Sequence, residues 1–206
     1  MSVSKTEIQT QFDTLVSKVI WPEFKKRGYS KTKNNFRYYD SAGWGKILSI
    51  QKSAYGDRSN IRFTLNTGIY LPEAERLWTR GRSISNERFL EPACLIRKRI
   101  GQLKGSDDLW YELTDQSEFD NLSRLVEQDI TTRVLPYLDR IDGVEAIMQQ
   151  LIQVKEPNSE LAIETLFNYG YQNEARKWIE DELTKTIYRT QRQKMLELQA
   201  RLAHSL

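Results

Sequence analysis

Residues 61–70 carry the pattern that most restricts how this chain can fold. Apolar side chains at Ile61, Phe63, Leu65 and Ile69 share one parity, and mostly polar residues lie between them. Because successive side chains of a β-strand point to opposite faces, this period of two predicts a strand with one buried face and one polar face. Such a strand needs paired neighbours and a second layer that covers its apolar side.

The segments around this strand predict an antiparallel sheet. Hydrophobic and β-branched runs of strand length occur at residues 36–40, 44–53, 93–103 and 109–113. The first two of these runs flank a Ser-Ala-Gly sequence, which is a hairpin-like connection between antiparallel strands. A short helix is predicted at 72–80, where Pro72 can begin it and Gly81 can end it.

Amphipathic helices are predicted before and after the sheet-forming segment. Ser4 and Glu7 form a capping-box pair ahead of a helical stripe of apolar residues, and a second stripe follows within residues 117–138. Pro22 and Pro136 should bend or restart these helices, because proline removes a backbone donor and crowds the preceding turn. We therefore expect an α+β fold, with an antiparallel sheet of four to five strands covered on one face by the two helices.

The last third of the chain predicts helices only. A helical hairpin is expected around Gly170, followed by a terminal helix from Thr184, and Trp178 and Leu183 are expected to be buried. This change in pattern predicts two parts, a sheet domain over residues 1–140 and a C-terminal helical extension over residues 141–206.

The counts of cysteine and histidine exclude several kinds of site. The single Cys94 cannot form an internal disulfide, and the single His204 leaves no ligand set for a Cys/His zinc site and no plausible Ser-His-Asp triad. The remaining candidates for acid–base or metal chemistry are carboxylates in expected loops and helix starts, namely Asp57, Glu73, Glu75, Asp107 and Asp108. Acidic residues are common at such places, so we expect no catalytic residues, no metal and no cofactor.

Hydropathy indicates where in the cell the protein is located, and charge indicates what kind of partner it binds. No apolar run has the length of a membrane span, and the first ten residues lack the apolar stretch of a signal peptide, so we expect a cytoplasmic protein. Ten Lys and Arg residues and four Glu residues lie between positions 58 and 104, which gives this segment a net charge of +6, against +3 for the whole chain. A basic segment of this kind favours anionic partners, and solvated arginines are the ordinary alternative.

Several local patterns, taken in order, resemble an uncharacterised bacterial family, domain of unknown function 4304. The residues that carry the resemblance are 22–29, Phe36, 51–53, 63–66, 68–70, 99–103 and the pair Trp110-Tyr111. The resemblance covers roughly the first two-thirds of the chain. It implies an α+β fold and supplies no catalytic residues, because the family has no established activity.

A shared parity of polar residues on three expected strands predicts a binding face. The residues on this parity are Gln51, Ser53, Arg62, Asn66, Tyr70, Arg97 and Arg99. If the strands are neighbours in register, guanidinium groups and neutral hydrogen-bonding groups converge on one side of the sheet, and such a set suits a carboxylate or a phosphate. The alternative is the solvated face of an antiparallel sheet, which alternates between polar and apolar side chains by default.

Three kinds of function remain open. The first is a non-enzymatic binding module that recognises a protein partner or an anionic ligand through the polar sheet face. The second is an enzyme acting on a phosphorylated or nucleic-acid substrate with carboxylates and arginines. The third is a nucleic-acid-binding protein that uses the basic segment and stacks bases on Trp44, Trp78 or Trp110. Tryptophans of this kind most often pack in cores, and the lack of a catalytic motif favours the first function.

Overall fold

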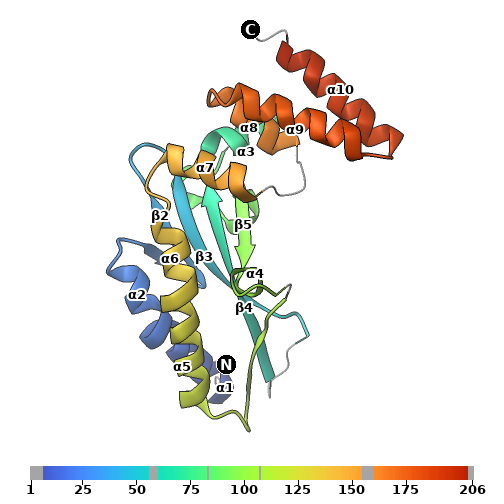
Figure 1. The fold of residues 1–206 in the computed structure, drawn as a ribbon. Helices are drawn as coiled ribbons and strands as arrows, with labels where there is room; N and C mark the ends of the chain where they lie inside the picture. The colour runs from blue at the N-terminus through green and yellow to red at the C-terminus, as the bar shows by residue number, and fades with distance from the viewer. Residues whose placement is uncertain (1–6, 56–59, 83, 107, 155–159, 204–206) are drawn as a thin grey trace. The chain divides into compact units, whose positions relative to one another are not determined.

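The computed structural model describes residues 7–55, 60–82, 84–106, 108–154 and 160–203 (Figure 1). Contacts between residues divide the chain into two compact units. The sheet unit comprises Met1–Tyr70 and Ser85–Asp142, and the helical unit comprises Leu71–Ile84 and Gly143–Leu206. Leu71–Ile84 lies within the sheet domain expected over residues 1–140, whereas its contacts are with the helical unit.

The sheet unit contains an antiparallel sheet. Its strands are β1 (Ser30–Thr32), β2 (Asn35–Tyr39), β3 (Gly45–Lys52), β4 (Asn60–Tyr70), β5 (Ile96–Arg99) and β6 (Tyr111–Thr114). The order is β1-β2-β3-β4-β5, and β6 pairs with the first residues of β4 while β5 pairs with the last ones. The expected α+β fold is therefore confirmed. The added strand, β1, is a three-residue exposed segment without apolar alternation, so the sequence gives no burial signal for it.

Two long helical segments cover one face of this sheet (Figure 1). The first runs through α1 (Glu7–Thr14), η1 (Leu15–Ile20) and α2 (Trp21–Lys25). The second runs through α5 (Phe119–Asp129), η4 (Ile130–Val134) and α6 (Leu135–Asp139). In both, a π-helical turn directly precedes the segment that carries Pro22 or Pro136. Since proline lacks the amide that an α-helical turn would use, a locally wider turn accommodates it and the helix continues. Ser4 lies outside the described residues.

The core of the sheet unit lies between these helices and the sheet. Phe63 on β4 is fully buried, with its ring 5.3 Å from Phe12 of α1 and 5.1 Å from Tyr111 of β6. Leu48 and Leu65 are also fully buried and point to the same side. The apolar residues of the pattern that predicted β4 therefore point to this helix-covered face. The residues between them point to the opposite face, which we call the outer face.

Lys46 of β3 is a charged residue on the helix-covered face. It is 8% exposed, and its Nζ donates to the carbonyl oxygens of Leu138 and Ile141 at 3.1 and 2.9 Å. Its Nζ also lies 5.1 Å from the centre of the Tyr38 ring. Burial lowers the pKa of Lys46 below its ordinary value, and nearby Asp139 opposes this shift. Lys46 therefore adds a charged donor to two carbonyls at and just beyond the end of α6, and the Leu138 carbonyl also accepts the N–H of Ile141 at 3.2 Å.

Replacement of Lys46 by methionine should lower the free energy of unfolding by about 1 kcal/mol, because two buried carbonyls lose a charged donor while the cost of burying the charge is relieved. Urea denaturation followed by circular dichroism measures the change. Lys25→Met removes an exposed lysine of α2 and should change stability by less than about 0.5 kcal/mol. Equal losses in the two variants would contradict the assigned role of Lys46.

The segment between β4 and β6 differs from its prediction. The single strand expected at 93–103 is divided into η3 (Glu91–Ala93), β5 (Ile96–Arg99) and α4 (Ile100–Leu103), and η2 (Asn86–Arg88) precedes them. The backbone leaves the strand after Arg99 because Gln102 Oε1 accepts its N–H at 2.8 Å, which starts a helical turn. A Cβ on Gly101 would lie 3.0 Å from the backbone nitrogen of Leu109, so only glycine fits there without displacement.

The helical unit consists of α3 (Pro72–Trp78), α7 (Val144–Val154), α8 (Glu160–Asn168), α9 (Gln172–Lys185) and α10 (Arg189–Ala203). The expected hairpin is formed by α8 and α9, and Gly170 turns the chain between them with φ of 87°. Trp178 is buried, and Leu183 is partly exposed. Within the described ranges, no helix has the length and apolar character needed to cross a membrane.

Candidate functional site: the polar end of the outer sheet face

The strand register brings the predicted binding residues onto one face. Asn66 of β4 lies opposite Ser49 of β3 on one side and opposite Arg99 of β5 on the other. Gln51 lies opposite Thr64, two residues before Asn66. Directly paired residues of antiparallel strands point to the same side, so these side chains lie on the outer face. The same parity places Arg62, Tyr70 and Arg97 there too.

One end of the outer face is covered by the segment between α3 and β5. Tyr70 is fully buried, and its ring stacks on Phe89 at 4.3 Å with an angle of 6° between the planes. Ile47 and Cys94 complete this apolar cluster. Arg37 fixes the covering segment from β2, since its Nε donates to the Phe89 carbonyl oxygen at 2.7 Å.

Two of the predicted residues belong to this covered end. The hydroxyl oxygen of Tyr70 accepts the backbone N–H of Asn86 at 3.1 Å, so both the ring and the hydroxyl serve packing. Arg97 donates from Nε and Nη2 to the two carboxylate oxygens of Glu91 at 2.7 and 3.0 Å. Glu91 is 8% exposed, so this bidentate pair anchors the covering segment to β5.

The other end of the outer face is polar, and its side chains form a hydrogen-bonded row. Arg99 Nε donates to Asn66 Oδ1 at 3.2 Å, and Asn66 Nδ2 donates to Gln51 Oε1 at 2.8 Å. Asn66 is 7% exposed, whereas Gln51 is exposed. The amide of Asn66 is therefore fixed in orientation by partners on both neighbouring strands. We call Gln51, Arg62, Thr64, Asn66, Arg99, Asp108 and Trp110 together the polar end.

Trp110 and Asp108 join this row from the loop that precedes β6. Asp108 Oδ1 accepts from Arg99 Nη1 at 2.7 Å, and Asp108 Oδ2 accepts from Trp110 Nε1 at 2.7 Å. These hydrogen bonds, first that of Arg99 and then that of Trp110, lower the pKa of Asp108. The guanidinium carbons of Arg62 and Arg99 lie 5.9 and 5.5 Å from the centre of the Trp110 ring. The ring thus interacts with both cations.

Thr64 lies between Arg62 and Asn66 on the same side of β4. It has no exposed surface, and its Oγ1 has no hydrogen-bond partner among the described residues. A buried hydroxyl without a partner costs free energy, and because Thr64 has no exposed surface its hydroxyl is not in direct reach of a ligand on the outer face.

Arg62 and Ser53 are two predicted residues at the edge of the polar end, and their side chains have different surroundings. Arg62 is exposed, and in the part of the chain that the structure describes its guanidinium has no carboxylate partner. Ser53 follows β3, where its N–H donates to the Arg62 carbonyl oxygen at 2.8 Å and its Oγ accepts the N–H of Tyr55 at 3.2 Å. Ser53 is therefore used by the turn, whereas Arg62 is exposed and its guanidinium lies over the Trp110 ring.

The other sequence candidates do not join the polar end as a catalytic set. Asp57 and Asp107 lie outside the described residues, and Glu73 and Glu75 belong to α3 of the helical unit. No group of three or more His, Cys, Asp or Glu residues in the described ranges could hold a metal ion. The binding set predicted from strand parity did not include Asp108 and Trp110. The sequence offers Trp110 only as a residue that could stack bases beside the arginines, and Asp108 only as a candidate for acid–base or metal chemistry.

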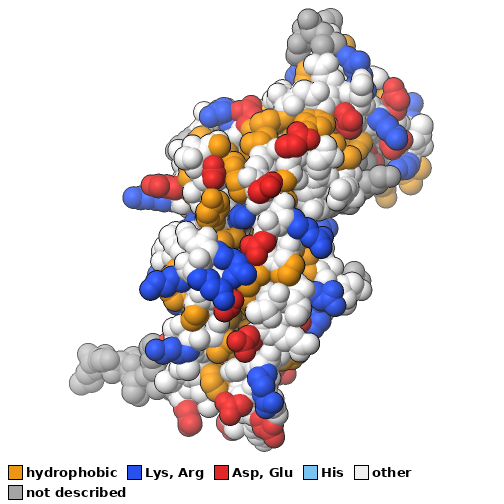
Figure 2. Space-filling model, turned by 60° about the vertical axis from the view of Figure 1, so that its left-hand side comes forward, with side chains coloured by type: hydrophobic (Ala, Val, Ile, Leu, Met, Phe, Trp, Pro, Cys, Tyr) orange, Lys and Arg blue, Asp and Glu red, His pale blue; other side chains and the backbone are white. Residues whose placement is uncertain are grey.

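The structure also shows where the basic residues of segment 58–104 lie. Its arginines are shared between the two units, with Arg76, Arg80 and Arg82 in the helical unit. On the face that Figure 2 presents, Lys and Arg side chains are interspersed with Asp and Glu, and apolar side chains lie between them.

The fold is that of an α+β domain, in which helices cover one face of an antiparallel sheet and the other face keeps a fixed polar end. A family model described as domain of unknown function (DUF4304) matches residues 20–140, which is more than half of the chain. The chain belongs to this family, and the expected resemblance is confirmed. Neither the curated proteins nor the solved structures contain a match to the chain.

Proposed function

We propose that this chain is a non-enzymatic, cytoplasmic binding module of a bacterial protein, which recognises an acidic group of a protein partner at the polar end of the outer face. The observation that carries the proposal is the fixed row from Arg99 through Asn66 to Gln51, beside the exposed Arg62, whose guanidinium has no carboxylate partner among the described residues. A carboxylate or phosphate of the partner would bind the guanidinium of Arg62 and compete with Asp108 for that of Arg99.

The side-chain types at the polar end favour binding over a merely solvated face. A solvated face carries exposed, mobile side chains, whereas Asn66 and Thr64 are 7% and 0% exposed, and Asn66 is held by two hydrogen bonds. Groups fixed in this way lose little conformational entropy when a ligand binds, which is the physical basis of preorganised recognition. The Trp110 ring adds a flat apolar surface of the kind enriched at interfaces.

The charge state of Asp108 favours a binding role over catalysis. It is a described carboxylate beside the arginines, and hydrogen bonds from Arg99 and Trp110 lower its pKa. A general acid or base works best with a pKa near the working pH, so a carboxylate shifted downward is poorly suited to either role. The lowered pKa of Asp108 is consistent with a role as a carboxylate that binds Arg99 within the same chain.

Arg62→Ala should reduce capture of the native partner about threefold to tenfold, because one charged hydrogen bond is lost at an exposed position. The measurement is affinity capture of the full chain from cells that produce it, with quantitative mass spectrometry of the bound proteins. Arg133→Ala is the matched control, since Arg133 is an exposed arginine of η4 on the helical layer. If the two variants retain every bound protein equally, the polar end is not the recognition site.

A further inference from the structure

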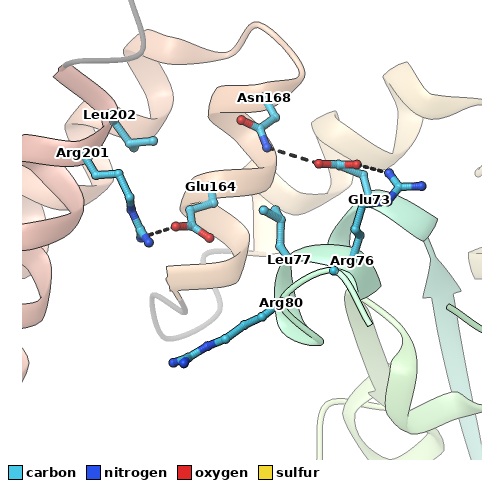
Figure 3. A pocket seen from close by; sticks show the side chains of 9 residues that line it. Glu73, Arg76, Leu77, Arg80, Glu164, Asn168, Arg201 and Leu202 are labelled. Atoms are coloured by element: carbon cyan, nitrogen blue, oxygen red, sulfur yellow. Dashed lines mark hydrogen bonds and ion pairs between the residues drawn. The ribbon is translucent and has the colours of Figure 1, made fainter. Parts of the chain in front are cut away.

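The helical unit contains a hollow of its own, between α3, α8 and α10 (Figure 3). Its volume is about 420 Å³, which is within the range of small-molecule sites. All of the side chains that line it belong to the helical unit, so this hollow is independent of the polar end of the sheet.

The two carboxylates of the hollow are already paired. Glu164 of α8 forms an ion pair with Arg201 of α10, and Glu73 of α3 forms one with Arg76 a turn later. Burial raises the pKa of Glu164, and the Arg201 charge opposes this shift. The Glu164–Arg201 pair joins α8 to α10, and the Glu73–Arg76 pair lies within α3, so each acid of the hollow has a cationic partner.

Arg80 is the charged side chain of the hollow that these pairs do not use. Its side chain is exposed and reaches into the open space below Glu164 (Figure 3), and within the described ranges it has no acidic partner. Its backbone has φ of 53°, in the left-handed region that residues other than glycine rarely adopt. Gly81 follows with φ of 78°, and its N–H donates to the Arg76 carbonyl oxygen at 2.8 Å, which ends α3.

Two apolar side chains also line the hollow. Leu77, one turn before Arg80 on α3, and Leu202 of α10 both line the hollow, and Leu202 is 8% exposed. A hollow that holds aliphatic side chains and a guanidinium with no acidic partner among the described residues is complementary to a molecule with one acid group and an aliphatic body. We propose that the hollow binds a small aliphatic carboxylate, with its acid group on Arg80 and its chain against Leu77 and Leu202.

The proposal predicts a dependence on chain length. Each methylene group that becomes buried should tighten binding by up to about fourfold, and because the hollow is open we expect hexanoate to bind about fivefold to tenfold more tightly than butanoate. Hexan-1-ol has the same chain without the charge and should bind at least tenfold more weakly than hexanoate.

The test uses the ¹⁵N-labelled full chain and follows the arginine Nε–H resonances by NMR during titration with hexanoate, butanoate, hexan-1-ol and inorganic phosphate. We expect a saturable shift of the Arg80 resonance that is lost in Arg80→Gln and kept in Arg82→Gln, an exposed arginine outside the hollow. The proposal is overturned if the shift does not saturate, if it persists in Arg80→Gln, or if phosphate binds as tightly as hexanoate. A failure here would leave the partner site of the sheet unit untouched, because the two tests use different residues.

Discussion

Replacement of Gly68 by alanine should lower the free energy of unfolding by about 2–3 kcal/mol. Gly68 lies on the outer face of β4, directly beneath the segment that covers the apolar end. A Cβ at this position would be 2.5 Å from Cys94 Sγ, 2.9 Å from Cys94 Cβ and 3.0 Å from Ile47 Cγ2. Contacts this short force the covering segment away from the sheet, and overpacking of this kind typically costs 1–3 kcal/mol. Denaturation in urea, followed by circular dichroism, measures the loss.

Two further variants separate this steric effect from the general effect of a glycine substitution. A Cβ on Gly143 meets no atom within 4 Å, so Gly143→Ala should change stability by less than about 1 kcal/mol. In a Cys94→Ala background the sulfur is absent while the Cβ contact remains, so the cost of Gly68→Ala should fall by about 1 kcal/mol. If Gly68→Ala is as stable as Gly143→Ala, the covering segment does not pack where the structure places it.

The sheet and its two faces could be predicted because they follow from local alternation. The period of two in residues 61–70 identified β4 and the side of it that the helices cover, and parity alone placed Asn66, Arg97 and Arg99 on the opposite side. The short strand β1 and the helical turn α4 were missed. The first has no buried residue to produce a pattern, and the second depends on contacts of Gly101 with residues several positions later.

The division of the outer face into a covered end and a polar end could not be read from parity. Tyr70 has the same parity as Asn66, yet it is buried because Phe89 stacks on it from a segment that returns to the sheet after an excursion into the helical unit. That return requires the absence of side chains at Gly45 and Gly68, where a Cβ would meet Phe89 or Cys94. Long-range packing of this kind leaves no periodic signal, so the sequence alone predicts a binding role for Tyr70.

The same limitation explains how Asp108 was overlooked as a member of the site. An acidic residue in a loop is ordinary, and only the three-dimensional arrangement brings it to Arg99 and Trp110. In that arrangement Asp108 occupies one side of the Arg99 guanidinium, as an acidic group of the partner would. Substitutions of Arg99 and of Asp108 should therefore change partner binding in opposite directions.

Arg99→Ala should weaken the proposed partner complex at least tenfold, because the partner loses a charged donor and Asn66 loses the bond that orients its amide, together about 1.5–3 kcal/mol. Asp108→Asn should strengthen the complex about threefold to tenfold, since a neutral amide competes less well for the guanidinium than a carboxylate does. Titration calorimetry with the partner recovered by affinity capture measures both dissociation constants, and Asp120→Asn removes an exposed carboxylate of α5 as a matched control. Loss of affinity in Asp108→Asn would mean that Asp108 itself contacts the partner, and the model of an internal competitor would be wrong.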